Sequence, residues 1–227
     1  MEKLRLISRS HRFRSACSGI FIFVLLAQFL RSGSAVWGAA FFFTASYLYF
    51  RRTANVFSAL PLFAGAATLP FFFPHNLGVP ISTLFAGVIA GLLYVAQGVK
   101  DLFLIRRETL LEAGAYVIAY IALLLFFMQA MSSAFLVVWL YAVMCLWLSF
   151  FAIARDGRVA LLSVTLFGEL IWIISWLPIG FLNSASLCFA VMLFMGDAVR
   201  ESRISGRNIA ILGALIVLIF ITSHWRF

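Results

Sequence analysis

Carboxyl groups inside long apolar runs are the residues of this chain that could do chemistry. Glu169 lies near the middle of one such run, while Asp101 and Asp197 each lie towards one end of another. Ionisable groups in hydrocarbon are costly, so an acid at such a position is by default a candidate for a functional site. Two carboxyls that face one cavity could work as general acid and base. We expect any enzymatic chemistry in this chain to depend on paired carboxyls.

Helical spacing groups the residues around Asp101. Gln97 and Asp101 are four positions apart and share a helix face, whereas Lys100 points to a neighbouring face. Lys100 is then free to reach lipid head groups or to pair with a carboxylate. A structural interpretation stays equally open, in which Asp101 and Asp197 balance nearby basic residues at the membrane interface. Glu169 is similarly open between a hydrogen-bonded structural carboxyl and a proton donor.

Other chemistries have weaker signals. The histidines lie near the termini or in a polar gap and lack the spacing of metal ligands: His11, His75 and His224. The cysteines lie in apolar runs, where buried reduced thiols are expected: Cys17, Cys145 and Cys188. The sequence contains no phosphate-binding glycine loop and no Gly-x-Ser-x-Gly elbow. We therefore expect neither a metal site nor a cofactor.

The composition places these acids in a membrane protein. The 227 residues are 64% hydrophobic and only 11% charged. A soluble domain of this size cannot bury so many apolar side chains, because a small globule keeps a large solvated surface. With lipid as the solvent, the formal net charge of +9 reflects basic loops that orient the chain and attract anionic head groups. Binding to nucleic acid is not expected.

The apolar runs lack alternating polarity, which predicts an all-α, polytopic bundle of about eight to nine transmembrane helices. The expected spans are residues 15–31, 35–50, 56–74, 81–105, 112–131, 133–154, 159–181, 183–199 and 207–223. The first span resembles a signal sequence, but Arg31 follows it and no clear cleavage site is present, so we keep it as a span or re-entrant anchor. Pro61, Pro70 and Pro178 fall inside spans and are expected to kink them.

The basic residues predict the orientation of the chain. Lys and Arg concentrate in the gaps that follow every second span. The intervening gaps contain none: residues 74–80, 131–133 and 182–184. Because loops rich in Lys and Arg stay in the cytoplasm, we expect a basic cytoplasmic N-terminal segment at 1–14 and a single transmembrane domain at 15–227. The plasma (inner) membrane is the expected location, with Asp101 and Asp197 at similar depth near the cytoplasmic side.

Several segments are similar to one known membrane family. They are Ala90 to Tyr94, Gly98 to Leu104, Gly114 to Tyr116, Val138 to Leu148, Gly168 to Leu170, Ala185 to Leu187, and Gly196 with Asp197. Together they resemble the spans of the YhhN, or lysoplasmalogenase, family. The resemblance covers about residues 36–224, with the first span an addition to the usual eight.

The resemblance implies an integral membrane hydrolase that cleaves the vinyl ether bond of lysoplasmalogens. The substrate is then a lysophospholipid of the membrane, and the products are a fatty aldehyde and a glycerophospho head group. Asp101 and Asp197 match the two family aspartates and would be catalytic. One acid protonates the alkenyl carbon, and the partner carboxylate stabilises the oxocarbenium-like species and activates water.

The same resemblance implies a set of substrate-binding residues around the two aspartates. Lys100 or Arg106 would hold the phosphate of the lysolipid. Tyr120 stands where the family has a histidine. Gln97 and Glu169 complete the expected substrate-binding residues.

Other interpretations stay open beside the hydrolase. A diverged, non-catalytic member would keep the helices and bind lipid or partner membrane proteins. Two membrane aspartates also suggest an intramembrane aspartyl protease, although the pair Gly196 and Asp197 lacks the earlier glycine of that motif. A transporter built from repeated halves with broken helices is not indicated. The sequence leaves the substrate and the oligomeric state undetermined.

Overall fold

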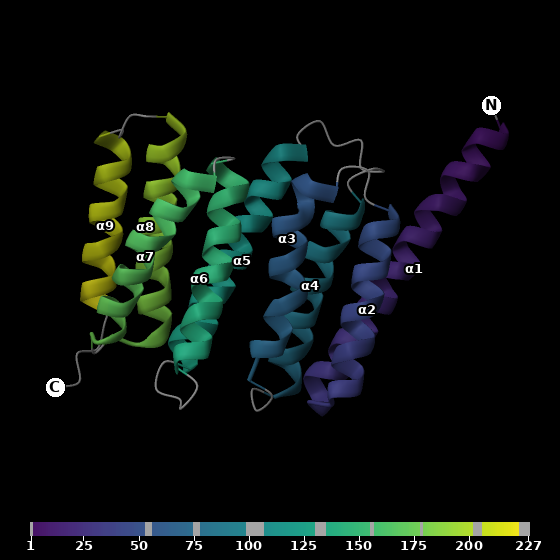
Figure 1. Cartoon of the computed structure of the whole chain (residues 1–227), viewed down its shortest axis with the longest axis horizontal. Coiled ribbons are helices and arrows are strands. Elements are labelled where there is room, and N and C mark those ends of the chain that lie inside the picture. The colour runs from purple at the N-terminus through teal and green to yellow at the C-terminus, as the bar shows by residue number, and fades with distance from the viewer. Residues whose placement is uncertain are drawn as a thin grey trace. The chain divides into compact units, whose positions relative to one another are not determined.

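A computed structural model shows that the chain is helical. It describes residues 2–52, 56–74, 78–98, 107–129, 135–154, 157–177, 179–201 and 206–222. Over these residues the chain forms nine α-helices and one short 3-10 helix, and no strand (Figure 1). The all-α prediction is confirmed for this part of the chain.

The helices coincide closely with the predicted spans. Their bounds are α1 Glu2–Ser32, α2 Ala35–Arg52, α3 Val56–Thr68, η1 Leu69–Phe72, α4 Val79–Gly98, α5 Arg107–Gln129, α6 Phe135–Ala154, α7 Gly157–Ser175, α8 Phe181–Glu201 and α9 Gly206–Thr222. The turn from α1 into α2 uses Gly33, which has a φ of 61° and donates its N–H to the Phe29 carbonyl at 2.8 Å. A glycine adopts this left-handed conformation without steric cost, so it ends the helix efficiently.

The largest differences from the predicted boundaries are at the start of α1, the end of α3 and the end of α7. Helix α3 ends at Thr68, and the predicted span 56–74 continues as the 3-10 helix η1. The backbone of α1 begins at Glu2, so most of the predicted N-terminal segment continues the first helix. Helix α7 ends at Ser175 instead of continuing through Pro178, and the predicted kink inside this span is wrong. Its last turn tightens, since Trp176 and Leu177 donate to carbonyls only three residues back. Proline has no N–H with which to continue a helix; Pro178 itself lies outside the described residues.

Packing divides the chain into two compact units. Unit 1 is Met1–Leu111 and unit 2 is Glu112–Phe227, so unit 2 contains most of α5 and all of α6 to α9. In unit 1, α1 packs against α2 and α4, and α3 packs against α4. In unit 2, α6 packs on α7, and α8 contacts α6, α7 and α9. The expectation of one domain over 15–227 stays a prediction.

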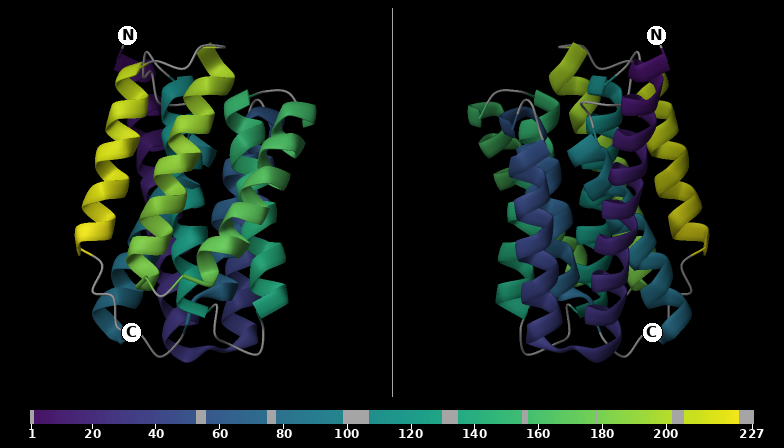
Figure 2. Two further views of the ribbon diagram at one scale, coloured as in Figure 1. Left: turned by 90° about the vertical axis from the view of Figure 1, so that its left-hand side faces the viewer. Right: turned by 90° about the vertical axis from the view of Figure 1, so that its right-hand side faces the viewer.

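Successive helices within each unit run in opposite directions (Figures 1 and 2). In unit 2 the first turns of α7 and α9 therefore lie at one end, and they carry Arg158 and Arg207. The opposite end holds the end of α5, the start of α6, the end of α7 and the start of α8. Its described residues include no Lys or Arg. The described basic residues of unit 2 thus lie at one end of the unit. This distribution is expected for a helix bundle whose orientation in the membrane is determined by the charges of its loops.

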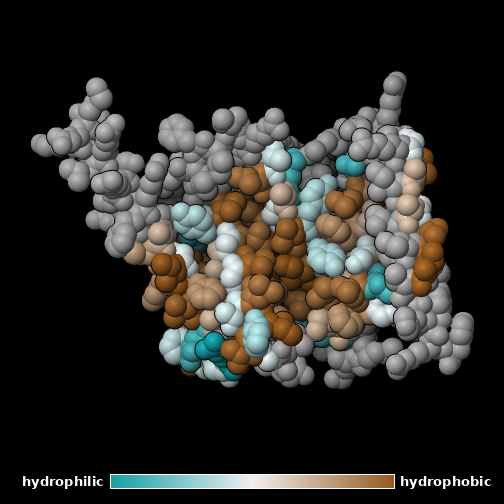
Figure 3. All heavy atoms as spheres, turned by 180° about the vertical axis from the view of Figure 1, so that it is seen from behind, coloured by the Kyte–Doolittle hydropathy of each residue, from teal (hydrophilic) through white to brown (hydrophobic). Residues whose placement is uncertain are grey.

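Three stretches of helix are long and apolar enough to cross a membrane, counted over the described residues: Val79–Gln97, Thr109–Gln129 and Gly157–Ser175. Helix α7 is apolar on both sides, because Phe167 and Ile171 are fully buried while Leu162 and Leu166 are more than 60% exposed. A helix that is hydrophobic all round is typical of a membrane span. Strongly hydrophobic side chains also gather midway along the helices on the face in Figure 3. Membrane association is supported; eight to nine spans remain a prediction.

Candidate functional site

Three predicted site residues lie outside the described residues. They are Lys100, Asp101 and Arg106, and they follow the last described residue of α4, Gly98. The structure therefore does not test the predicted meeting of Asp101 with Asp197. The other four predicted residues are described, and they fall into three separate environments.

Gln97 is part of the helix packing of unit 1. Its side chain is 4% exposed, and its Nε2 donates to the carbonyl of Ala45 in α2 at 3.4 Å. A buried amide needs such a partner, since an unsatisfied polar group away from water is costly. Gln97 thus connects α4 to α2 through a side-chain to backbone hydrogen bond.

Asp197 lies at a close approach of two helices in unit 2. The residue is half-buried near the end of α8. Its neighbour Gly196 faces α5, where a Cβ on residue 196 would meet the hydroxyl oxygen of Tyr116 at 2.6 Å. Real Cβ atoms do not come so near another heavy atom. The glycine therefore allows the Tyr116 side chain to reach the α8 backbone beside Asp197.

Tyr120 lies one turn further along α5 and also faces α8. Its hydroxyl is 3.4 Å from the Ser186 hydroxyl, and either group could donate. The rings of Tyr116 and Tyr120 both contact Phe189, with centroids 6.3 Å and 5.0 Å away. These contacts define the α5–α8 seam, formed by Tyr116, Tyr120, Ser186, Phe189 and Gly196. We include Asp197 in the seam by helical spacing, because a residue eleven positions after Ser186 lies on the same side of α8. Two predicted site residues, Tyr120 and Asp197, therefore belong to one seam.

The two residues occupy different levels of that seam. Ser186, which contacts Tyr120, and Asp197 are eleven positions apart on α8. At 1.5 Å per residue this separation is about 16 Å along the helix axis. Phe189 lies between the two levels on α8, and the Tyr116 side chain extends from Phe189 to the level of Gly196 and Asp197. The seam is therefore an elongated strip with a hydroxyl pair towards one end and a carboxyl towards the other, and aromatic rings between them.

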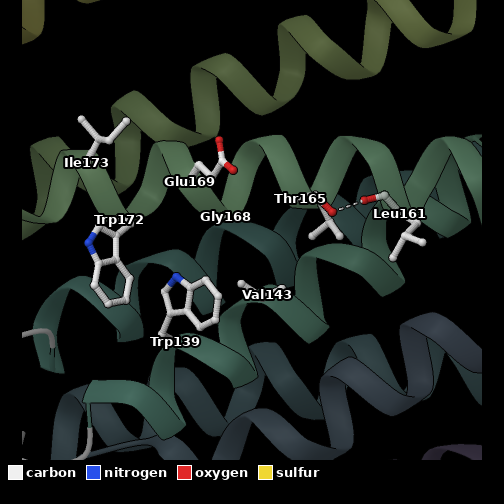
Figure 4. Close-up of a pocket in the computed structure, with 9 residues that line it drawn as sticks. Trp139, Val143, Leu161, Thr165, Gly168, Glu169, Trp172 and Ile173 are labelled. Carbon is white, nitrogen blue, oxygen red and sulfur yellow. Dashed lines mark hydrogen bonds between the residues drawn. The ribbon is translucent and has the colours of Figure 1, made fainter.

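Glu169 lies in a third environment, a groove between α6 and α7 (Figure 4). The groove has a volume of about 640 Å³. Helix α6 contributes Trp139 and Val143, and α7 contributes residues spaced three or four apart, among them Thr165, Gly168 and Trp172. This spacing places the α7 residues on one side of the helix. We call this site the α6–α7 groove.

The α6–α7 groove combines an acid with aromatic and apolar walls. Glu169 lies exposed at the rim of the groove, with its carboxyl turned away from the two indoles in Figure 4, and it is the one ionisable residue among those that line the groove in the described chain. The rings of Trp139 and Trp172 meet edge to face, with centroids 5.9 Å apart and an interplanar angle of 88°. Thr165 donates its hydroxyl to the Leu161 carbonyl at 2.9 Å, so its proton is already used within α7.

One polar atom in the groove is left without a partner. The Trp139 Nε1 is buried, and it makes no hydrogen bond with any part of the chain that the structure describes. In Figure 4 this nitrogen lies on the edge of the indole that faces α7. Gly168 sits against the same ring, since a Cβ there would be 3.7 Å from it. Buried donors normally have an acceptor, so this N–H is an unsatisfied donor in the wall of the groove, and the indole must shift before a bound group can reach it.

Trp139 and Tyr116 were not predicted as site residues from the sequence. Both are aromatic residues in apolar runs, and such residues are usually packing or lipid-facing bulk. A signal was nevertheless present in α7, where Thr165, Glu169 and Trp172 recur at helical spacing around the small residue Gly168. Only the packing of α6 on α7 reveals which tryptophan faces that strip.

The fold and these sites define a helical protein with helices able to cross a membrane, a tyrosine-rich helix seam and an acidic, aromatic groove. No group of three or more metal-ligating side chains occurs in the described part of the chain. No protein-family model matches the chain, and neither a curated protein nor a solved structure matches it. The similarity to the lysoplasmalogenase family thus rests on sequence segments alone and stays a hypothesis.

Proposed function

We propose that this chain is a polytopic protein of the plasma (inner) membrane with its N-terminus in the cytoplasm. Three helical stretches of sufficient length and apolarity support the membrane assignment. The exposed leucines of α7 support it further, because they would face water in a soluble protein. The basic end of unit 2, with Arg158 and Arg207, would face the cytoplasm.

We further propose that the protein hydrolyses the vinyl ether bond of lysoplasmalogen-type lysolipids. The observation that carries this proposal is the α5–α8 seam, which contains Tyr120 and Asp197, two residues expected at the site from the sequence. The seam supplies a carboxyl at one end and the hydroxyls of Tyr120 and Ser186 at the other. Phe189 between them offers an apolar surface on which an alkenyl chain could lie.

The proposed chemistry uses two carboxyls. A protonated acid donates its proton to the second alkenyl carbon, and the ether oxygen shares the resulting positive charge as an oxocarbenium ion. Water adds to the first carbon while the other carboxylate takes up its proton. In the collapse of the hemiacetal, its hydroxyl gives its proton to the first carboxylate and the bond from carbon to the glycerol oxygen breaks. The glycerol oxygen takes the proton held by the second carboxyl, so a fatty aldehyde and a glycerol hydroxyl leave and both carboxyls return to their starting states. Asp197 takes one role and Asp101 the other, with Lys100 or Arg106 binding the phosphate.

Aldehyde release from lysoplasmalogen by the full chain in detergent tests this proposal. We expect Asp197→Asn and Asp101→Asn each to lower the rate by at least about a hundredfold, the usual size of a general acid–base contribution. The matched control is Asp156→Asn, which removes a carboxyl from the segment of sequence that joins α6 to α7 and should leave the rate of aldehyde release unchanged. Wild-type protein that elutes as a folded species and releases no aldehyde would exclude the hydrolase.

A non-catalytic protein that binds lipid or a partner membrane protein is the second candidate. The observation that favours it is the use of Gln97, an expected substrate-binding residue, in the packing of α4 against α2. Two results together would support this candidate. The purified protein should retain lysolipid without releasing aldehyde, and the Asp101→Asn and Asp197→Asn variants should retain as much lysolipid as the wild type. Rates that fall in both variants exclude it.

A further inference from the structure

We propose that the α6–α7 groove binds a lipophilic organic cation that carries an oxygen acceptor close to its positive charge. In this complex the exposed Glu169 side chain turns towards the indoles and neutralises the charge, the two indoles cover the cationic group, and a small shift of the Trp139 ring lets its N–H donate to the acceptor. The groove is separate from the α5–α8 seam, so this proposal does not depend on the hydrolase.

The carboxyl of Glu169 selects for positive charge. It lies at the thirteenth of the nineteen residues of a helix that is able to span a membrane, Gly157–Ser175. An acid in such surroundings is costly unless a cation or a hydrogen-bond donor offsets it. Its neighbours on the exposed side of α7 are apolar or uncharged, such as Thr165, Leu166 and Ile173. Arg158, the described basic residue of the same helix, lies eleven positions earlier.

The two tryptophans select for an organic ion. Perpendicular indole rings form a corner in which a cation can contact a ring face, and an ammonium group over tryptophan is attracted by the electron-rich face of the ring. Trp172 is 40% exposed, so its ring surface is accessible from the groove. A small hydrated metal ion would gain little from this apolar surface. An alkylated ammonium has both the charge for Glu169 and the apolar substituents for the rings.

The unpartnered indole N–H adds a second requirement. Trp139 Nε1 is buried in the wall of the groove and has no acceptor among the described residues. A ligand with a carbonyl or ether oxygen beside its ammonium group would satisfy this donor, and a bare alkylammonium would leave it unsatisfied. The groove volume of about 640 Å³ is in the range of small-molecule sites, which favours a compact amphiphile over a second helix.

Three matched probes test each part of the proposal by calorimetric titration of the full chain in an uncharged detergent. Lauroylcholine has a quaternary ammonium and an ester carbonyl. Its isostere 3,3-dimethylbutyl laurate replaces the charged nitrogen with carbon, and dodecyltrimethylammonium keeps the charge but lacks the carbonyl. We expect lauroylcholine to bind about tenfold tighter than the neutral ester, in keeping with cation–π and charge contacts in an apolar groove.

Substitutions show which residues cause the preference for a positive charge and the preference for a carbonyl oxygen. Glu169→Gln should abolish the preference for charge, and Glu169→Asp should retain part of it. Trp139→Phe should weaken lauroylcholine more than dodecyltrimethylammonium, because the phenyl ring keeps the aromatic contact and loses the N–H. The matched control is Trp147→Phe, which changes an exposed indole of α6 that does not line the groove. It should leave all three affinities unchanged.

Several outcomes would overturn the proposal. Equal binding of lauroylcholine and the neutral ester in wild-type protein would make the groove a site for acyl chains alone. If Glu169→Gln bound lauroylcholine with unchanged affinity, the carboxyl of Glu169 would take no part in binding. A wild-type dimer that binds no probe and dissociates on the Glu169→Gln substitution would instead assign the groove to a second copy of the chain.

Discussion

The hydroxyl oxygen of Tyr116 on α5 lies so near Gly196 on α8 that a Cβ on residue 196 would approach it to 2.6 Å. This contact fixes the distance between the two helices beside Asp197. The next nearest ring atoms of Tyr116 would be 3.6 Å and 3.8 Å from that Cβ, which are ordinary contacts. The hydroxyl alone therefore accounts for the steric conflict.

We predict that Gly196→Ala destabilises unit 2 by about 1 to 3 kcal/mol, the usual cost of an added methylene in a well-packed interior. In a Tyr116→Phe background the same substitution should cost much less, since the conflicting oxygen is absent. Denaturant titration in detergent of both single variants and the double variant measures this coupling. Equal costs of Gly196→Ala in the two backgrounds would show that the two residues are not in contact.

We predict that Gln97→Ala destabilises unit 1, because it removes the second hydrogen bond of the Ala45 carbonyl, which lies inside α2, and opens a cavity between α4 and α2. The expected cost is about 2 kcal/mol or more from the combined loss of packing and hydrogen bond. The matched control is Gln28→Ala, whose side chain is exposed on α1 and should change stability by less than about 0.5 kcal/mol. Thermal unfolding of the two variants in the same detergent compares them, and similar melting temperatures would contradict a packing role for Gln97.

Most helix positions could be predicted from the sequence, because a membrane span needs about 20 apolar residues and short polar gaps separate such runs. The end of α7 could not be located in this way. Apolar residues continue from Ser175 to Phe181, so hydropathy alone extends the helix through Pro178. Backbone hydrogen bonding ends the helix earlier, since Trp176 and Leu177 already close a tighter turn.

The candidate site was predictable in part. Acids in apolar runs identified Glu169 and Asp197 because charge is rare in hydrocarbon. Their partners were not predictable, since Trp139 and Tyr116 differ from other aromatic residues only in which helix they face. Gln97 could not be placed by its sequence spacing alone. Its amide donates to the Ala45 carbonyl of α2, a packing contact that the spacing did not indicate, while its predicted shared face with Asp101 involves a residue outside the described part of the chain.

We predict that only one of the three cysteines reacts in the folded protein. Cys17 is exposed on α1, whereas Cys145 and Cys188 are fully buried in the core of unit 2. A membrane-permeant maleimide should therefore label one thiol per chain, and mass spectrometry after digestion should find the label on Cys17. The variant Cys17→Ser should take up no label until detergent denaturation exposes the other two. Labelling of Cys145 or Cys188 in native protein would show that unit 2 packs differently.

We predict that the polar gaps of the chain alternate between the two sides of the membrane. Because α6 and α7 run in opposite directions, the end of α6 and the start of α7 lie at the basic end of unit 2, which carries Arg158. A reporter fused after Arg155 should be active in the cytoplasm, since moving several cationic side chains through hydrocarbon is costly. A reporter in the gap from Pro74 to Pro80 should be active outside. Both reporters on the same side would contradict this topology, because three spans are expected between the two positions: 81–105, 112–131 and 133–154. Replacing Arg155 and Arg158 with glutamine tests whether these charges orient the chain. With fewer cationic residues in this segment, a larger share of the protein should insert in the opposite orientation. The control is Arg31→Gln at the C-terminal end of α1, which should leave the orientation unchanged.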